Sequence, residues 1–397
     1  MLNKIKNIEE ENIILNISIM KDIIVIFLGP FLTAYFVSVS TNNIIDLSLY
    51  YIFSYLFAAI TTYFVSKKVK NKSKIQTFRF GVLTSFIYIM SIILLRENLV
   101  DYLFFVAFLH GFSTAFYWVP FNLFLTYKIK KSKKASFMIK NQIISSVVGV
   151  VVPIVLASLI TITNYALTGV IILILSLIQL ILSNFLKKEE TTDFPKLSLK
   201  NTFQKLKKNK KVKSSLIAEF LIGMNISSGA LQVLVTLLIL GNFHTDMNLG
   251  LITSFTTFMT IISLYIYGKV YKNKDDRKII IVSSVLPFIA LLLLLFVRNN
   301  ITLIIYNLCF AVFANILLVI RKIHLYTLAG SNIISEDIKV EFLTLREIVL
   351  NMGRVTSYLL LLIAGIIGGD LILNFVLIIL TISILIAGLY IKNWKLN

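Results

Sequence analysis

Apolar runs of about twenty residues recur along the whole chain, and they limit the solvent in which it can fold. A helix rises 1.5 Å per residue, so roughly twenty such residues cross a hydrocarbon layer about 30 Å thick. The sequence is 57% hydrophobic and only 15% charged, whereas soluble domains carry about 25% charged residues. One soluble core cannot hold so much apolar surface, and the sequence therefore predicts an integral membrane protein.

Twelve of these runs are predicted to be membrane-spanning helices. Continuous apolar runs favour helices over a membrane barrel, whose strands alternate in about ten-residue segments. The predicted fold class is therefore all-α. The expected spans are residues 21–40, 48–66, 77–95, 101–125, 140–162, 166–186, 215–240, 248–268, 279–297, 301–322, 342–366 and 371–391.

The formal net charge of +20 is distributed by loop. Lysines are concentrated in alternate connections, at 67–74, 128–134, 187–213 and 272–278. The only Lys or Arg residues in the other connections are Arg96 and Arg298. The positive-inside rule then places the basic connections and both termini in the cytoplasm. This distribution argues against a nucleic-acid partner. We expect a multi-pass, monomeric protein of the plasma membrane, whose partners are the lipid bilayer, a small-molecule substrate and a coupling ion.

The chain divides into two similar parts around a lysine-rich segment. Residues 1–186 are expected to form an N-terminal six-helix bundle, 187–213 a cytoplasmic linker, and 214–397 a second six-helix bundle. A shift of 202 residues aligns YFVSKKVKNKSK, at 63–74, with YIYGKVYKNKDD, at 265–276. Both stretches follow the second helix of their part, which indicates an internal duplication.

Six plus six helices, a long central basic loop and a basic loop after the second helix of each half resemble the major facilitator superfamily. The resemblance covers essentially the whole chain. In the superfamily's signature loop the basic positions persist at Lys67 and Lys70, but Ser66 stands where an aspartate is usual and Thr62 where a glycine is usual. The resemblance implies two pseudo-symmetric bundles that alternate around a binding site between them.

Arg354 is the charged residue expected nearest the middle of the membrane, roughly 18 Å from the outer end of its span. Buried ionisable residues at that depth are functional candidates. Glu347, Asn351 and Arg354 have i, i+4, i+7 spacing and share one helix face. Two interpretations stay open: an internal ladder that locks the helix, or a guanidinium that binds an anionic group of the substrate.

Other polar and aromatic residues are expected near the same level. If the superfamily plan holds, they border a central cavity and bind substrate together with Arg354 and Asn351. Each also has a packing interpretation, because amides often join helices and a lone histidine is usually a packing residue. These substrate-binding candidates are Tyr117, Trp118, Asn225, Gln232 and Asn315.

Four ionisable residues are candidates for proton coupling. His110 is predicted to lie about 14 Å from the outside, and its unperturbed pKa near 6.5 suits a proton relay. Asp22, Glu219 and Glu347 are predicted about 28 to 33 Å from the outside. At that depth they would be interfacial anchors paired with loop lysines, and proton coupling is the alternative.

The leading hypothesis is a secondary active transporter that moves a small solute, anionic or amphipathic, by alternating access driven by a proton or sodium gradient. The chain carries no P-loop, no paired Cys or His metal spacing and no Gly-x-Ser-x-Gly elbow, so we expect no enzyme, no cofactor and no metal. A lipid or lipid-linked precursor flippase of another twelve-helix fold is the main alternative. A membrane-embedded glycan or lipid transferase and a non-transporting sensor or immunity protein are further alternatives, although the outer loops are short for the transferase.

Overall fold

The computed structural model describes residues 10–40, 42–71, 74–127, 134–186, 198–226, 228–270, 276–329, 331, 333–335 and 338–392. Every regular element in these residues is a helix. The first part contains α2 (Glu10–Ile26), η1 (Phe27–Phe31), α3 (Leu32–Val39), α4 (Asn43–Asn71), α5 (Lys74–Leu95), η2 (Arg96–Leu99), α6 (Leu103–Tyr127), α7 (Lys134–Ile162) and α8 (Tyr165–Ser183). The second contains α9 (Leu199–Leu206), α10 (Lys210–Met224), α11 (Ala230–Phe243), α12 (Asp246–Val270), α13 (Asp276–Phe296), α14 (Asn300–Ala329), α15 (Lys339–Ile367) and α16 (Asp370–Lys392).

Eleven helical segments among these residues are long and apolar enough to cross a membrane, and the chain is a multi-pass membrane protein. Each of the eleven overlaps one span of the sequence prediction. Glu10–Val39 joins α2, η1 and α3, and Lys74–Leu99 joins α5 and η2. The expected seventh span, 215–240, is instead two shorter helices, α10 and α11. The expected twelve uninterrupted spans are thus not all present as continuous helices.

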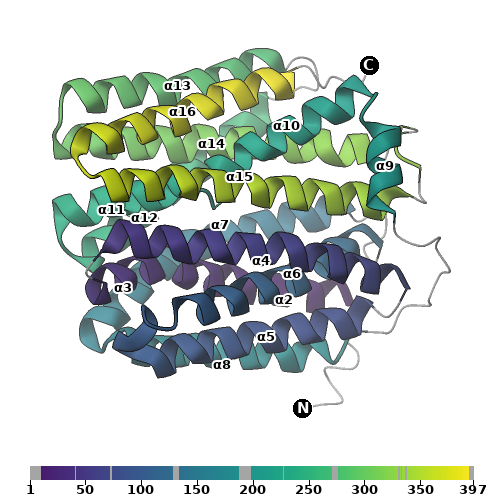
Figure 1. Ribbon diagram of the computed structural model, residues 1–397, viewed down its shortest axis with the longest axis horizontal. Coiled ribbons are helices and arrows are strands. Elements are labelled where there is room, and N and C mark those ends of the chain that lie inside the picture. The colour runs from purple at the N-terminus through teal and green to yellow at the C-terminus, as the bar shows by residue number, and fades with distance from the viewer. Residues whose placement is uncertain are drawn as a thin grey trace.

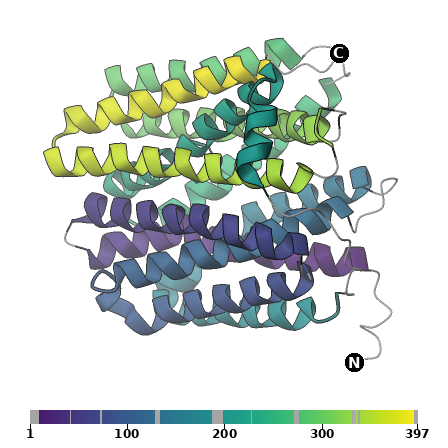
Figure 2. The same ribbon diagram turned by 45° about the vertical axis from the view of Figure 1, so that its right-hand side comes forward.

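The helices run nearly parallel in two groups, with α2 to α8 below and α10 to α16 above (Figure 1). We call the end of the bundle that carries α9 the α9 end, and the other end the hairpin end. Figure 2 shows α9 running across the α9 end instead of along the bundle. Of the predicted linker, 187–197 lies outside the described residues, and the rest forms α9 and the start of α10.

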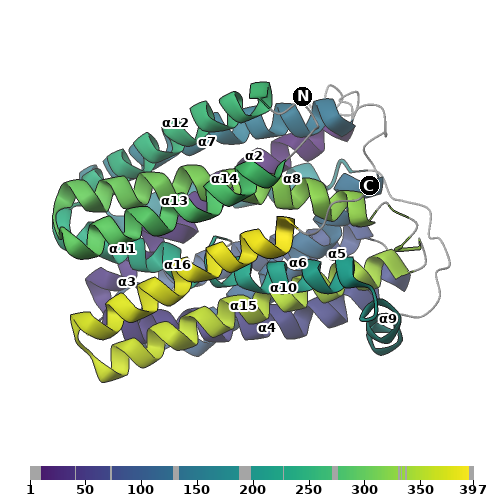
Figure 3. The same ribbon diagram turned by 90° about the horizontal axis from the view of Figure 1, so that it is seen from above.

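Two seams join the two groups, α4 with α15 and α7 with α12. Seen from above, these two helix pairs lie along opposite edges of the molecule (Figure 3). The outer end of the first helix, α3, also contacts α11. A binding site between the groups must therefore lie between or along these seams.

Large apolar side chains cover the outward faces of the bundle, for example along α8. In water such a surface would drive aggregation, but in a bilayer it contacts lipid tails of the same polarity. The exposed apolar residues of α8 are Leu167, Val170, Ile171, Ile174, Leu177, Ile178 and Ile181.

The first helix of each group is interrupted partway along. Pro30 lacks an amide hydrogen, and the surrounding residues Phe27–Phe31 widen into a π-helical turn. Between α10 and α11, Asn225 caps the break: its Oδ1 accepts from the Ile226 amide at 2.5 Å, and its Nδ2 donates to Ser383 Oγ at 2.6 Å. A Cβ on Gly229 would lie 2.3 Å from the Met224 carbonyl oxygen, so only glycine fits this turn.

Candidate functional site

Arg354 lies near the centre of α15, on the seam with α4, and α15 continues for about 20 Å in both directions. Its Nη1 donates to Asn351 Oδ1 at 2.7 Å. Its guanidinium carbon lies 4.9 Å from the centre of the Tyr55 ring, within cation–π range. The Arg354–Asn351 rung of the expected ladder is therefore present. The Glu347 rung is not, because Glu347 Oε1 accepts from Arg346 Nη1.

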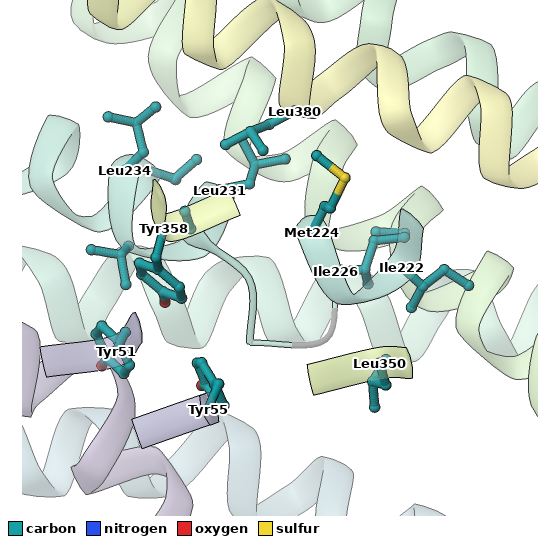
Figure 4. Close-up of a cluster of buried hydrophobic side chains, with 14 of the residues drawn as sticks. Tyr51, Tyr55, Ile222, Met224, Ile226, Leu231, Leu234, Leu350, Tyr358 and Leu380 are labelled. Carbon is teal, nitrogen blue, oxygen red and sulfur yellow. The ribbon is translucent and has the colours of Figure 1, made fainter. Parts of the chain in front are cut away.

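Three buried tyrosines extend the site across the seam. The Tyr51 and Tyr358 rings stack with their centres 4.6 Å apart, and the Tyr55 and Tyr358 centres lie 5.9 Å apart. Figure 4 shows Tyr51 and Tyr55 on α4 facing Tyr358 on α15, beside the chain that joins α10 to α11. With Arg354 over Tyr55, the site presents aromatic faces next to a guanidinium.

His110 and two further tyrosines form a second layer behind Tyr51 and Tyr55. His110 Nδ1 and Tyr50 Oη are 3.0 Å apart, and Tyr50 Oη also hydrogen-bonds Tyr88 Oη. The His110 ring stacks on Tyr88 with a centre distance of 5.0 Å and an interplanar angle of 8°. The Tyr55 and His110 ring centres are 6.2 Å apart. A continuous aromatic layer thus joins His110 on α6 to Arg354 on α15.

Arg354 supplies the positive charge beside this layer. A second cation, Lys21 on α2, lies elsewhere in the first group of helices, beside Tyr117. Lys21 is buried, and its Nζ lies 4.4 Å from the centre of the Tyr117 ring. A guanidinium beside aromatic rings suits an anionic group attached to an apolar or aromatic body, since guanidinium binds carboxylate and phosphate and the rings bury the apolar part.

A separate ionic network lies inside the second group of helices. Glu219 Oε2 on α10 accepts from Arg321 Nη1 on α14 and from Arg346 Nε on α15, each at 2.9 Å. The Glu219, Arg321 and Arg346 side chains are 0%, 4% and 11% exposed. The expected pairing of Glu219 with loop lysines is therefore wrong, because two buried arginines supply its partners.

Asp22 on α2 stands apart from that network. Its Oδ2 accepts from Ser145 Oγ on α7 at 2.5 Å. Lys322, on α14 of the other group, acts on Asp22 electrostatically. Asp22 is half-buried, and Lys322 is exposed. This carboxylate therefore faces a cation from the opposite group of helices.

The comparisons with known proteins decide the family. The model of the Major Facilitator Superfamily matches residues 13–333, which is most of the chain. The chain belongs to the major facilitator superfamily. The all-helical architecture agrees with that membership, and the superfamily and its solved neighbours support a membrane transporter.

This superfamily member is similar to two kinds of known protein. The uncharacterized protein YqgE of Bacillus subtilis (strain 168) is 27% identical over 345 residues, which are 85% of this chain and 79% of YqgE. A solved bacterial homologue of the iron transporter ferroportin, in an outward-facing state, has a TM-score of 0.66 and 14% identity over 98% of this chain and 99% of its own. The same homologue with soaked iron matches equally well. At that identity the likeness shows the fold alone.

The other residues predicted to bind substrate in this superfamily member lie away from Arg354 or have partners of their own. Tyr117 is buried in a core cluster of the first group, where its hydroxyl accepts from Gln179 Nε2 at 3.1 Å, and the half-buried Trp118 packs edge-on against it. Asn315 Nδ2 donates to a carbonyl oxygen of its own helix at 2.6 Å. Asn225 caps the α10–α11 break, and Gln232 is exposed on α11.

Sequence reasoning missed the tyrosines and Arg321. Tyr51 and Tyr55 are spaced i, i+4, as are Arg354 and Tyr358, so each pair occupies one helix face. The shared spacing was the usable signal, because Tyr51 lies only three residues inside the expected span 48–66, near the interface where tyrosines are common. Among the described residues, no group of three or more His, Cys, Asp or Glu side chains could hold a metal ion.

Proposed function

We propose that this transporter is a secondary active carrier for a small solute that combines an anionic group with an apolar or aromatic body. The observation that carries the proposal is Arg354: a guanidinium at the centre of its span, on the seam between the two groups, placed over the Tyr55 ring. A charge at this depth is costly unless it is satisfied or functional. A bound anion would accept hydrogen bonds from the Arg354 guanidinium in place of Asn351.

The broken helices support the same location. In many transporters, interrupted helices in corresponding positions of two repeats border the binding site at the bilayer midplane. Here the π-turn of the first helix and the break at Asn225 interrupt the first helix of each group. The chain joining α10 to α11 lies next to Tyr358, whose hydroxyl is 3.4 Å from the Ser228 carbonyl oxygen.

Coupling to a proton or sodium gradient is part of the proposal, and the contacts rank the four candidates. Glu219 is held by two arginines, and Glu347 is paired with Arg346, so both suit structural roles. Asp22 has a serine hydroxyl at short range and an opposing lysine across the interface, and His110 bonds a tyrosine next to the site. Asp22 and His110 are therefore the preferred coupling residues.

We further propose that the α9 end faces the cytoplasm at the plasma membrane and that the protein acts as a monomer. The helix ends that flank the lysine-rich connections lie at the α9 end (Figure 1), and the positive-inside rule orients such connections inward. Both termini would then be cytoplasmic. Residues 1–9 and 393–397 lie outside the described residues.

Flux through the purified protein in proteoliposomes tests the function. The panel is benzoate, octanoate, inorganic phosphate and, because one solved neighbour is a homologue of an iron transporter, Fe²⁺. Each is measured with and without an imposed proton or sodium gradient. We expect gradient-driven flux of benzoate or octanoate, because both join a carboxylate to an apolar body. Gradient-driven flux of Fe²⁺ alone, or of no member of the panel, would count against the proposal.

Two pairs of variants assign the site. Arg354→Ala should abolish flux and Arg354→Lys should retain part of it at a raised KM, because lysine keeps the charge but loses the fork. Tyr55→Phe should transport nearly as well as wild type, whereas Tyr55→Ala should not, because only the former keeps the ring. Elution as a monodisperse, thermally stable protein is required of every variant. Wild-type flux in Arg354→Ala would show that Arg354 does not bind the anion.

A further inference from the structure

Helix α9 lies across the end of the bundle, whereas the membrane spans run along it (Figure 2). It packs on α15, and Figure 3 shows it at the outer edge of the molecule, at the end of the bundle where α15 begins. The span of α15 runs from Lys339 to Ile367. A short helix that crosses the start of a span lies in the plane of the membrane surface. This arrangement places α9 at the level of the lipid headgroups.

One side of α9 is buried against the bundle, and another is exposed. Thr202 and Leu206 are 3% and 5% exposed, and their i, i+4 spacing puts them on the buried side. Lys200, Phe203 and Lys207 are spaced i, i+3, i+7, and all three are exposed. Lys207 caps the helix and keeps helical backbone angles, so it continues that spacing. We call these three residues the α9 face.

The α9 face combines an aromatic ring with two flexible cations. The Phe203 side chain is 47% exposed, although a phenylalanine ring gains free energy when it leaves water. Helices that lie in the membrane interface carry such rings on one side and lysines beside them. Lysine stems can follow the apolar surface while the ammonium groups reach the headgroups. The α9 face therefore suits a surface that is apolar below and negatively charged above.

The charge around α9 has one sign. Residues 198–218 contain seven lysines and neither aspartate nor glutamate. Within the described part of the chain, the ion pairs lie elsewhere, around Glu219 and between Arg298 and Asp370. An anionic phosphate that carries two acyl chains matches both the lysines and the exposed ring, whereas a free phosphate matches only the lysines.

We propose that the α9 face binds an anionic phospholipid, with Lys200 and Lys207 at the headgroup and the Phe203 ring among the first carbons of the acyl chains. The bound lipid holds the segment that joins the two halves at the membrane surface. The site is separate from Arg354, which lies at the centre of its span. It requires neither a particular transported solute nor a particular coupling ion.

Tryptophan fluorescence in proteoliposomes reports which lipid lies next to α9. Trp118 and Trp394 are the only tryptophans of the chain, so Phe203→Trp in a Trp118→Phe, Trp394→Phe background gives one reporter on the α9 face. The full-length protein is reconstituted in equal amounts of phosphatidylglycerol and phosphatidylcholine. Bromine atoms, which quench tryptophan at short range, are placed near the glycerol end of the acyl chains of one lipid or the other. The lipid composition is then constant, and only the label moves.

We expect brominated phosphatidylglycerol to quench the reporter about fivefold more than brominated phosphatidylcholine, because one lysine near an anionic lipid surface contributes about that factor. Lys200→Gln with Lys207→Gln should bring the ratio close to one. Lys205→Gln with Lys213→Gln is the matched control, because it removes the same charge from exposed residues on another side of α9 and on α10. This control should keep most of the preference.

A reporter on the far side of α9 supplies the second control. Asn201 is exposed and lies two residues before Phe203, on nearly the opposite side of the helix, so Asn201→Trp in the same background should be quenched weakly by either lipid. Equal quenching by the two lipids at position 203, or no quenching there, would overturn the proposal. Equal loss of the preference in the two lysine pairs would also overturn it, since a diffuse charge effect would then replace the α9 face. No flux is measured, so these outcomes are independent of the transport assay.

Discussion

Glu219→Gln should destabilise the transporter more than any other single change to its charged residues. The carboxylate accepts from Arg321 and Arg346 at 2.9 Å, and all three side chains are almost wholly removed from solvent. Hydrogen bonds to charged groups contribute about 1.5–3 kcal/mol each. Removing one partner of a buried ion pair costs about 3–5 kcal/mol, because the remaining charge stays buried. Glutamine keeps an acceptor oxygen but not the charge, so we expect a loss of about 3 kcal/mol.

Glu347→Gln is the matched control. Its carboxylate is 16% exposed, and its partner Arg346 keeps Glu219 as a second acceptor. We expect its cost to be at most about 1 kcal/mol. The double variant Glu219→Leu with Arg321→Leu should recover most of the loss, because replacing a buried ion pair by apolar residues of similar volume is often neutral or stabilising.

Thermal and denaturant-induced unfolding in detergent measures these differences. A midpoint for Glu219→Gln equal to that of wild type would refute the reasoning. That result would mean that the charge of Glu219 does not stabilise the folded transporter through Arg321 and Arg346. An equal loss in Glu347→Gln would instead show that the network does not act as described.

Three further pairs are checked by the same unfolding assay. Gly353→Ala should cost about 1–3 kcal/mol, since its Cβ would lie 2.0 Å from a carbonyl oxygen of α10, whereas Gly241→Ala, with open space around it, should be neutral or stabilising. Asn225→Ala should cost about 1–3 kcal/mol through its lost hydrogen bonds, and the exposed Gln232→Ala less than about 0.5 kcal/mol. Tyr358→Ala should cost about 3–5 kcal/mol and Tyr358→Phe under about 1 kcal/mol, because the ring and not the hydroxyl makes the close contacts. Equal effects within any pair would contradict the assigned contacts.

The sequence predicted eleven of the apolar spans in their order, because bilayer thickness sets a similar minimum length for each of them. The prediction failed at the seventh span. The apolar pattern is continuous from 215 to 240, although the helix is broken there between α10 and α11. The hydrophobic pattern does not register that break, because the residues around it are apolar or small. Asn225 was noticed as a polar residue, but its role as a cap depends on Ser383, 158 residues away.

The candidate site was predicted in part. Arg354 was identified because a cation far from both ends of a span is costly wherever its partners are. Its aromatic partner was not, because Tyr55 lies about 300 residues earlier in the chain and only the packing of α4 on α15 brings it near. Glu219 was noticed as an ionisable residue near one end of its expected span, while Arg321 was passed over at the end of its own. In both cases the sequence showed the charged residue but not the residue that it contacts.

The two seams between the halves carry different side chains. Along α7 and α12 small residues let the helices approach: a Cβ on Gly250 would lie 2.6 Å from Ala157 Cβ, and one on Gly149 would lie 2.8 Å from Thr257 Cγ2. Such an approach leaves no room between the helices for long side chains. Along α4 and α15, Tyr51, Tyr55, Arg354 and Tyr358 fill the space between the helices with rings and a guanidinium. Two halves of similar plan therefore meet through seams lined by different side chains, and the Arg354 site lies on the seam of α4 with α15.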